Sequence, residues 1–88
     1  MKIDRVLLSR IVRTLLNEPR CLMSVHDLSN TLEMRVDSDF DRLNGHINIL
    51  EDLGYIKKNE SNRELLRLTY FGYEALEDLG ITDSAYSS

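Results

Sequence analysis

Residues 39–56 read DFDRLNGHINILEDLGYI, and this stretch decides the fold. Its apolar residues recur at spacings of three and four, which predicts one amphipathic helix over 39–53. Gly54 is well placed to end this helix, because glycine readily adopts the left-handed conformation that follows a helix C-terminus. The predicted buried stripe consists of Phe40, Leu43, Ile47, Leu50 and Leu53.

The next residues predict a β-hairpin and a closing helix. The segments 55–58 (YIKK) and 64–69 (ELLRLT) flank the polar segment 59–63 (NESNR), as two strands flank a turn. Thr69 is a suitable N-cap for a last helix over 70–79. The inward-facing residues of that helix are predicted to be Phe71, Ala75, Leu76 and Leu79.

Three elements are predicted before residue 39. The first is a helix over 4–16, and the second is a brief strand at the apolar run 21–23. Ser24 then caps a helix over 25–32. The polar residues that follow read as a turn, in which Asp37, Ser38 and Asp39 supply caps for the next helix.

Length and composition indicate one globular domain. The chain has 88 residues, of which 42% are hydrophobic and 30% charged, and this is typical of a soluble domain. Residues 1–80 are expected to form the domain, and 81–88 a flexible polar tail. One cysteine excludes an internal disulfide. No apolar run reaches the ~18 residues of a membrane helix, so we expect a cytoplasmic protein without membrane contact.

Charge is unevenly distributed along the chain. The net charge is −4, with +3 in residues 1–20, −5 in 21–54, +2 in 55–68 and −4 in 69–88. Positive charge therefore gathers at the start of the chain and in the predicted hairpin. Any anionic partner would be attracted there first.

The order of elements, and two segments in particular, resemble the winged helix-turn-helix family. Residues 45–56 (GHINILEDLGYI) are similar to the end of a recognition helix entering a wing. Residues 66–72 (LRLTYFG) are similar to the return strand of a wing entering a closing helix. The resemblance covers about residues 3–80. It implies a mainly α fold with a small β-hairpin: a three-helix core, a wing and a C-terminal helix.

What the resemblance implies for function is a DNA-binding transcriptional regulator. Helix 39–53 would enter the major groove, and the wing 55–69 would lie on the phosphate backbone. Arginine can read guanine and asparagine adenine. The implied groove-facing residues are Asp41, Arg42, Asn44, Gly45, His46 and Asn48. The implied phosphate contacts are Arg20, Lys57, Lys58 and Arg63.

The acidic charge of the helix-turn-helix segment departs from this pattern, because DNA-reading domains are usually basic. Asp37, Asp39 and Asp41 cluster at the start of the presumed recognition helix. Carboxylates there complement the helix dipole but repel phosphate. Two alternatives follow. The acidic face could dock on a basic protein partner, or it could imitate the phosphates of DNA and inhibit a nucleic-acid-binding protein.

Self-association is predicted from helix 4–16. Its apolar rows cover more than the ~100° stripe that a surface helix needs. The surplus residues Val6, Val12 and Leu16 are therefore predicted to form the seam of a two-fold homodimer.

No constellation of residues indicates catalysis or a cofactor. Cys21, His26 and His46 lack the paired spacing of a zinc site. Cys21 lies in an apolar run, where nothing marks a base and an orienting acid around it. Four glycines are too few and too scattered for a phosphate-binding loop. The chain is predicted to be neither an enzyme nor a metal or cofactor protein.

Overall fold

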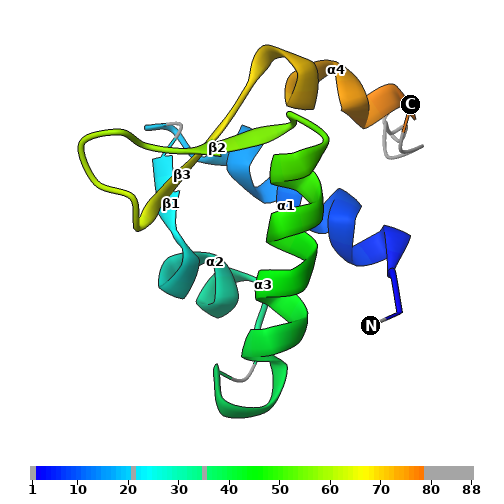
Figure 1. The fold of residues 1–88 in the computed structure, drawn as a ribbon, viewed down its shortest axis with the longest axis vertical. Coiled ribbons are helices and arrows are strands. Elements are labelled where there is room, and N and C mark those ends of the chain that lie inside the picture. The colour runs from blue at the N-terminus through cyan, green and yellow to red at the C-terminus, as the bar shows by residue number, and fades with distance from the viewer. Residues whose placement is uncertain (1, 21, 35, 79–88) are drawn as a thin grey trace.

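The computed structural model describes residues 2–20, 22–34 and 36–78 (Figure 1). Within them lie four helices and one three-stranded antiparallel sheet. No helix in this part of the chain is long and apolar enough to cross a membrane. The tail 81–88 falls outside the described residues. The elements in chain order are α1 (Arg5–Asn17), β1 (Leu22–Ser24), α2 (Val25–Thr31), α3 (Val36–Asp52), β2 (Ile56–Lys58), β3 (Leu65–Leu68) and α4 (Tyr70–Asp78).

The sheet has the order β1-β3-β2, so the second strand of the hairpin is central. The hairpin predicted from the alternation of residues is confirmed, with Ile56 opposite Leu68 and Lys58 opposite Leu66. The brief strand predicted before Ser24 is also confirmed. It completes the sheet by pairing Met23 with Leu66.

Local capping signals explain where the helices begin and end. The Ser24 hydroxyl accepts a hydrogen bond from the Asp27 N–H (3.0 Å), as expected for the N-cap of α2. The Thr69 hydroxyl accepts from the Gly72 N–H (3.1 Å) and caps α4. Gly54 has a φ of 83° and ends α3 as predicted. The Tyr55 N–H there donates to the Leu50 carbonyl (2.9 Å), which closes the helix end.

α3 begins earlier than predicted, at Val36 instead of residue 39. Asp37 and Ser38 therefore lie inside its first turn and do not precede it as caps. An acidic first turn is compatible with helix, because carboxylates there face the positive end of the helix dipole. The side chains of residues 36–38 are outside the described set.

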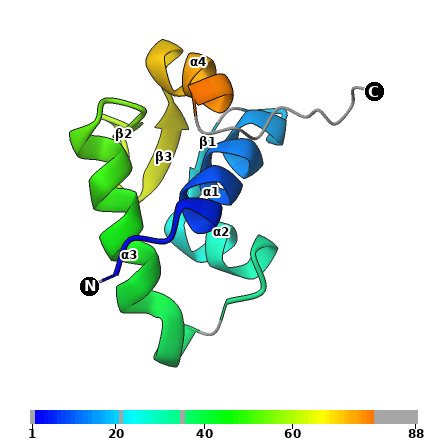
Figure 2. The same ribbon diagram turned by 90° about the vertical axis from the view of Figure 1, so that its right-hand side faces the viewer.

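α1 lies in the middle of the molecule, with α3 beside it, α2 below and α4 above (Figure 2). This position accounts for its wide apolar surface. Val12 is fully buried in the core of its own domain, and Leu16 is half-buried. Val12 is therefore wrong as a dimer residue: its surface is covered by elements of the same chain. Val6 is 69% exposed, and a homodimer through it stays a prediction.

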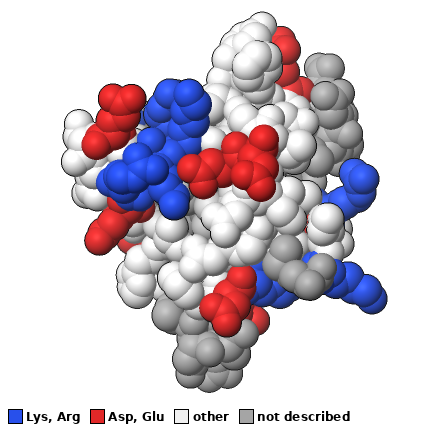
Figure 3. All heavy atoms as spheres, viewed as in Figure 1, with Lys and Arg blue, Asp and Glu red and all other residues white. Residues whose placement is uncertain are grey.

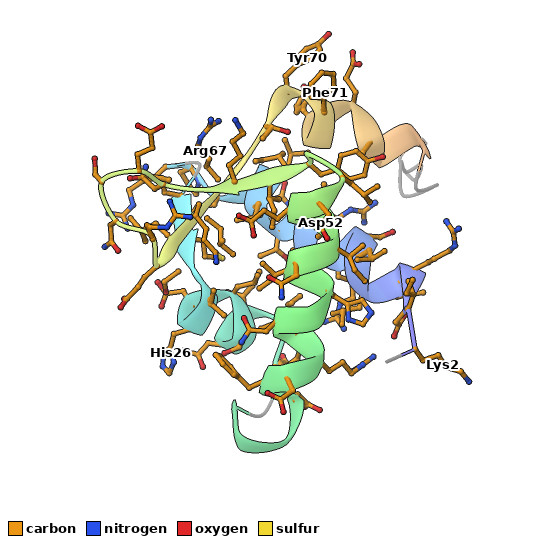
Figure 4. All side chains as sticks on the ribbon, in the orientation of Figure 1. Lys2, His26, Asp52, Arg67, Tyr70 and Phe71 are labelled. Carbon is orange, nitrogen blue, oxygen red and sulfur yellow. The ribbon has the colours of Figure 1, made fainter. Side chains whose placement is uncertain are left out.

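The inward face predicted for α4 is confirmed at Ala75 and wrong at Phe71. Phe71, which the helical spacing predicts to be buried, is 66% exposed, whereas its neighbour Gly72 and Ala75 are buried. Figure 4 shows Tyr70 and Phe71 at the outer start of α4. The helix approaches the rest of the fold through its smallest residues, so its aromatic residues remain outside. The side chain of Leu76 and all of Leu79 lie outside the described residues.

Leu53 also differs from its prediction. It was placed at the end of the buried stripe of helix 39–53, yet it is 52% exposed. The Leu53 N–H still donates to the Ile49 carbonyl (3.0 Å), so the helical hydrogen bonds reach Leu53, but its side chain lies beyond the part of α3 that the core covers. The rest of the stripe is inside: Leu43, Ile47 and Leu50 are buried, and Phe40 is half-buried.

Candidate nucleic-acid interface

A groove of about 510 Å³ lies between α2, α3 and the β2–β3 hairpin. Buried Ile47 and half-buried Val25 and Phe40 make up its apolar floor, and its other lining residues are polar. Both walls carry residues that the sequence singled out. The polar lining residues are Asn44 and Asn48 from α3, Lys58, Arg63 and Glu64 from the hairpin, and Ser24 and His26 from the start of α2.

Asn44 and Asn48 form one wall of the groove. They are four residues apart on α3, so their side chains project from the same side of the helix. Core residues on the other side, among them Leu43 and Leu50, hold the helix in place. In the described part of the chain, neither amide makes a hydrogen bond to the protein. Both amides are therefore free to bind a ligand.

The two adjacent lysines of β2 face opposite sides of the sheet. Lys58 pairs in register with buried Leu66 and lines the groove. Lys57 lies opposite Arg67 on the outer face. Successive side chains of a strand alternate in direction. Lys58 therefore reaches the groove and Lys57 does not, although both lysines border a second, smaller hollow.

Arg67 is a basic residue of the hairpin that is not among the predicted DNA contacts. It lines a smaller hollow of about 270 Å³ together with Lys57 and Lys58. Figure 3 shows Lys and Arg side chains gathered over the hairpin, with acidic side chains nearby on either side. Alternation along LLRL would have turned Arg67 outward. Only the strand register places it opposite Lys57.

His26 is a groove residue that the sequence pattern does not indicate. It is exposed in the first turn of α2 and lines the groove. In Figure 4 His26 and Arg67 lie toward opposite ends of β1. No spacing in the sequence marks His26, because its position depends on how α2 meets the hairpin.

His46 is not accessible for the DNA contact predicted for it. Its side chain is 0% exposed. Nε2 accepts a hydrogen bond from the Asp4 backbone N–H (2.8 Å), and Nδ1 donates to the Arg42 carbonyl oxygen (2.7 Å). These partners select the tautomer with its proton on Nδ1. His46 joins α3 to the start of α1 and does not face the groove.

Arg42 also lies away from the groove. Its guanidinium forms a 2.6 Å ion pair with Asp4, and both side chains line a hollow at the start of α1. Asp4 caps α1 by accepting hydrogen bonds from the Val6 and Leu7 N–H groups. The Leu7 hydrogen bond is the largest cause that lowers the pKa of Asp4 below 3.8, and Arg42 adds to it. Arg42 is thus paired with Asp4 of the same chain, and it does not line the groove that contains Asn44 and Asn48.

The remaining predicted residues are dispersed. Arg20 is exposed two residues before β1, at the end of that strand away from Ser24, and does not line the groove. Asp41 is exposed on α3, while Asp39 is half-buried and has an interaction partner within the chain. The side chain of Asp37 is outside the described residues. Among the three aspartates at this end of α3, Asp41 is thus the one whose side chain is described as exposed.

Residues 2–20, 22–34 and 36–78 contain no group of three His, Cys, Asp or Glu side chains that could hold a metal ion. The chain matches no protein-family model, no curated protein and no solved structure. The chemistry of the groove is therefore the basis for assigning a function.

Proposed function

We propose that this chain is a winged helix-turn-helix DNA-binding domain of the transcriptional-regulator type. In this proposal α3 enters the major groove, and the β2–β3 hairpin is the wing that lies on the phosphate backbone. The order of elements supports it: three helices precede the hairpin, a short strand joins its sheet, and a helix follows. This is the order expected of the winged helix plan.

The observation that carries the proposal is the pairing of two kinds of side chain across one groove. Asn44 and Asn48 offer unpaired amides on α3, while Lys58 and Arg63 offer cations on the hairpin. DNA presents this combination of partners, because base edges with donors and acceptors lie between two rows of phosphates. An α-helix also fits the width of the major groove.

The charge of the domain sets the strength of this binding. The whole chain is negative at −4, so attraction to DNA must come from local positive charge, and the hairpin segment 55–68 carries +2. If Lys57, Lys58, Arg63 and Arg67 neutralise about four phosphates, the logarithm of the binding constant should fall against the logarithm of salt concentration with a slope of about −3 to −4.

The test is a titration of the protein into a fluorescently labelled mixed-sequence duplex, followed by anisotropy at about 50 and about 200 mM salt. Changing Lys58→Ala and Arg63→Ala together should weaken binding about tenfold or more and flatten the salt slope by about 2. The matched control is the pair Lys2→Ala and Arg5→Ala, which removes the same charge from exposed positions away from the groove.

Two outcomes would contradict the proposal. One is an absence of salt-sensitive binding by the wild type at the lower salt concentration, where attraction to phosphate is strongest. The other is an equal loss of affinity in both double variants, because net charge and not the groove would then govern binding.

Asp41 distinguishes DNA binding from an acidic docking face. It is exposed on α3 and would lie near phosphates in the proposed complex. Asp41→Asn should therefore strengthen duplex binding about threefold, because it removes one repulsive charge. If the acidic face instead binds a basic partner, the same change should leave the duplex titration unchanged and weaken binding to a lysine-rich peptide.

A further inference from the structure

We infer that the groove selects A·T base pairs, with Asn44 and Asn48 reading adenine and the apolar floor receiving the thymine methyl group. This inference rests on the proposed function and names the DNA that the same site would prefer. It depends on which side chains of α3 line the groove and which do not.

The α3 residues that line the groove include no side chain of the type that reads guanine. Guanine presents two acceptors in the major groove, O6 and N7, which arginine or lysine contacts through paired donors. Arg42 is the one Lys or Arg in α3, and it is bound to Asp4 at the start of α1. Its side chain lies in a different hollow from the two asparagines. The helix therefore has no cation directed at a guanine edge.

α3 presents the side chain that reads adenine. Adenine offers one acceptor at N7 and one donor at N6, and an asparagine amide supplies the matching donor and acceptor. Asn44 and Asn48 are both unpaired in the described part of the chain and one helical turn apart. At a guanine, the amide oxygen of each would face a second acceptor and lose one hydrogen bond.

The apolar floor fits the other base of the pair. Thymine carries a C5-methyl group in the major groove, where cytosine has only a hydrogen. Val25 and Phe40 are half-buried in the same groove as the two asparagines, and Ile47 there is buried. A methyl group placed against these side chains would be removed from water.

The remaining polar groups of the groove are Ser24 and His26 at the start of α2, and Lys58, Arg63 and Glu64 on the hairpin. Ser24 can bond any base edge, and one N–H of His26 can bond the N7 of adenine or of guanine, so neither residue favours G·C. Lys58 and Arg63 are on the hairpin wall, where the proposed function assigns them to phosphate. Asp41 could accept a hydrogen bond from cytosine N4, but it does not line the groove. A guanine preference would therefore require Arg63 to leave the backbone, which is an outcome the experiment below detects.

The experiment compares four labelled 20-base-pair duplexes by anisotropy: alternating A·T, alternating G·C, A·T with 7-deaza-adenine, and A·T with uracil for thymine. Removing N7 or the methyl group alters the major groove alone, so shape and minor-groove effects remain. The wild type should bind A·T about tenfold tighter than G·C. 7-Deaza-adenine should abolish most of that advantage, and uracil should reduce it about threefold.

The variant Asn44→Ala/Asn48→Ala should lose the preference for A·T, keep its affinity for G·C, and not respond to 7-deaza-adenine. Asn30→Ala is the matched control, because Asn30 is exposed on α2 and does not line the groove. Circular dichroism should show that all variants remain folded.

The outcomes separate this inference from the function on which it rests. If no duplex binds, the proposed function itself fails. If A·T and G·C bind equally, DNA binding stands and the base preference is overturned. A preference for A·T that 7-deaza-adenine leaves intact would indicate reading through the minor groove and overturn it as well. A preference for G·C that Arg63→Ala removes would assign base reading to the hairpin instead of α3.

Discussion

Replacing Gly72 with alanine should lower the free energy of unfolding by about 3 kcal/mol, as overpacking against fixed backbone does at the upper end of its usual range. A Cβ atom at Gly72 would overlap the Tyr55 carbonyl oxygen and lie 2.7 Å from a Leu68 methyl carbon. Tyr55 cannot move away easily. Its N–H donates to the Leu50 carbonyl, and its carbonyl accepts from the Thr69 N–H.

This prediction has the opposite sign to the one expected from helix propensity, since alanine is normally favoured over glycine within a helix by about 1 kcal/mol. Urea denaturation followed by circular dichroism measures the difference. Tyr73→Ala serves as a control in the same helix, because its side chain is exposed and should change stability by less than about 0.5 kcal/mol. A Gly72→Ala protein as stable as the wild type would contradict the close approach of α4 to Tyr55.

Replacing His46 with alanine should cost about 3 kcal/mol of stability. The change empties a fully buried position and leaves the Asp4 N–H without its acceptor. The Arg42 carbonyl also loses a hydrogen bond from Nδ1. Because Asp4 caps α1, the loss should loosen the start of that helix and its attachment to α3.

Urea denaturation again measures the change, and Asn48→Ala is the control at an exposed position on the same helix. The His46→Ala protein, at temperatures where it remains folded, should retain duplex affinity because His46 does not line the groove. Unchanged stability together with a loss of DNA affinity would instead support the contact with a base that the sequence had predicted for His46.

The helices, the hairpin and their ends could be predicted from sequence because short-range interactions determine them. Ser24 caps α2 by bonding an N–H three residues away. Thr69 does the same for α4, and Gly54 ends α3 with a positive φ. The predicted start of α3 is three residues late, because Asp and Ser are typical N-caps while an Asp such as Asp37 is also favoured inside the first turn.

The candidate site could be predicted in part. Four of the eight residues predicted to contact DNA line one groove, namely Asn44, Asn48, Lys58 and Arg63. The other four are placed elsewhere: His46 in the core, Arg42 on Asp4, Lys57 on the outer face of the sheet, and Arg20 before β1. A position on a predicted helix or strand determines the direction of a side chain only relative to that element. It does not determine which other element the side chain faces.

By itself the sequence determined which segments are helical or extended, because periodicity and caps act within a few residues along the chain. Only the tertiary structure decided which faces are covered. The rows of α1 are buried on several sides because three helices and β3 contact it, so Val12 belongs to the core. Phe71 is outside because α4 approaches through Gly72. Burial depends on contacts between elements far apart in sequence, and no local pattern specifies which elements meet.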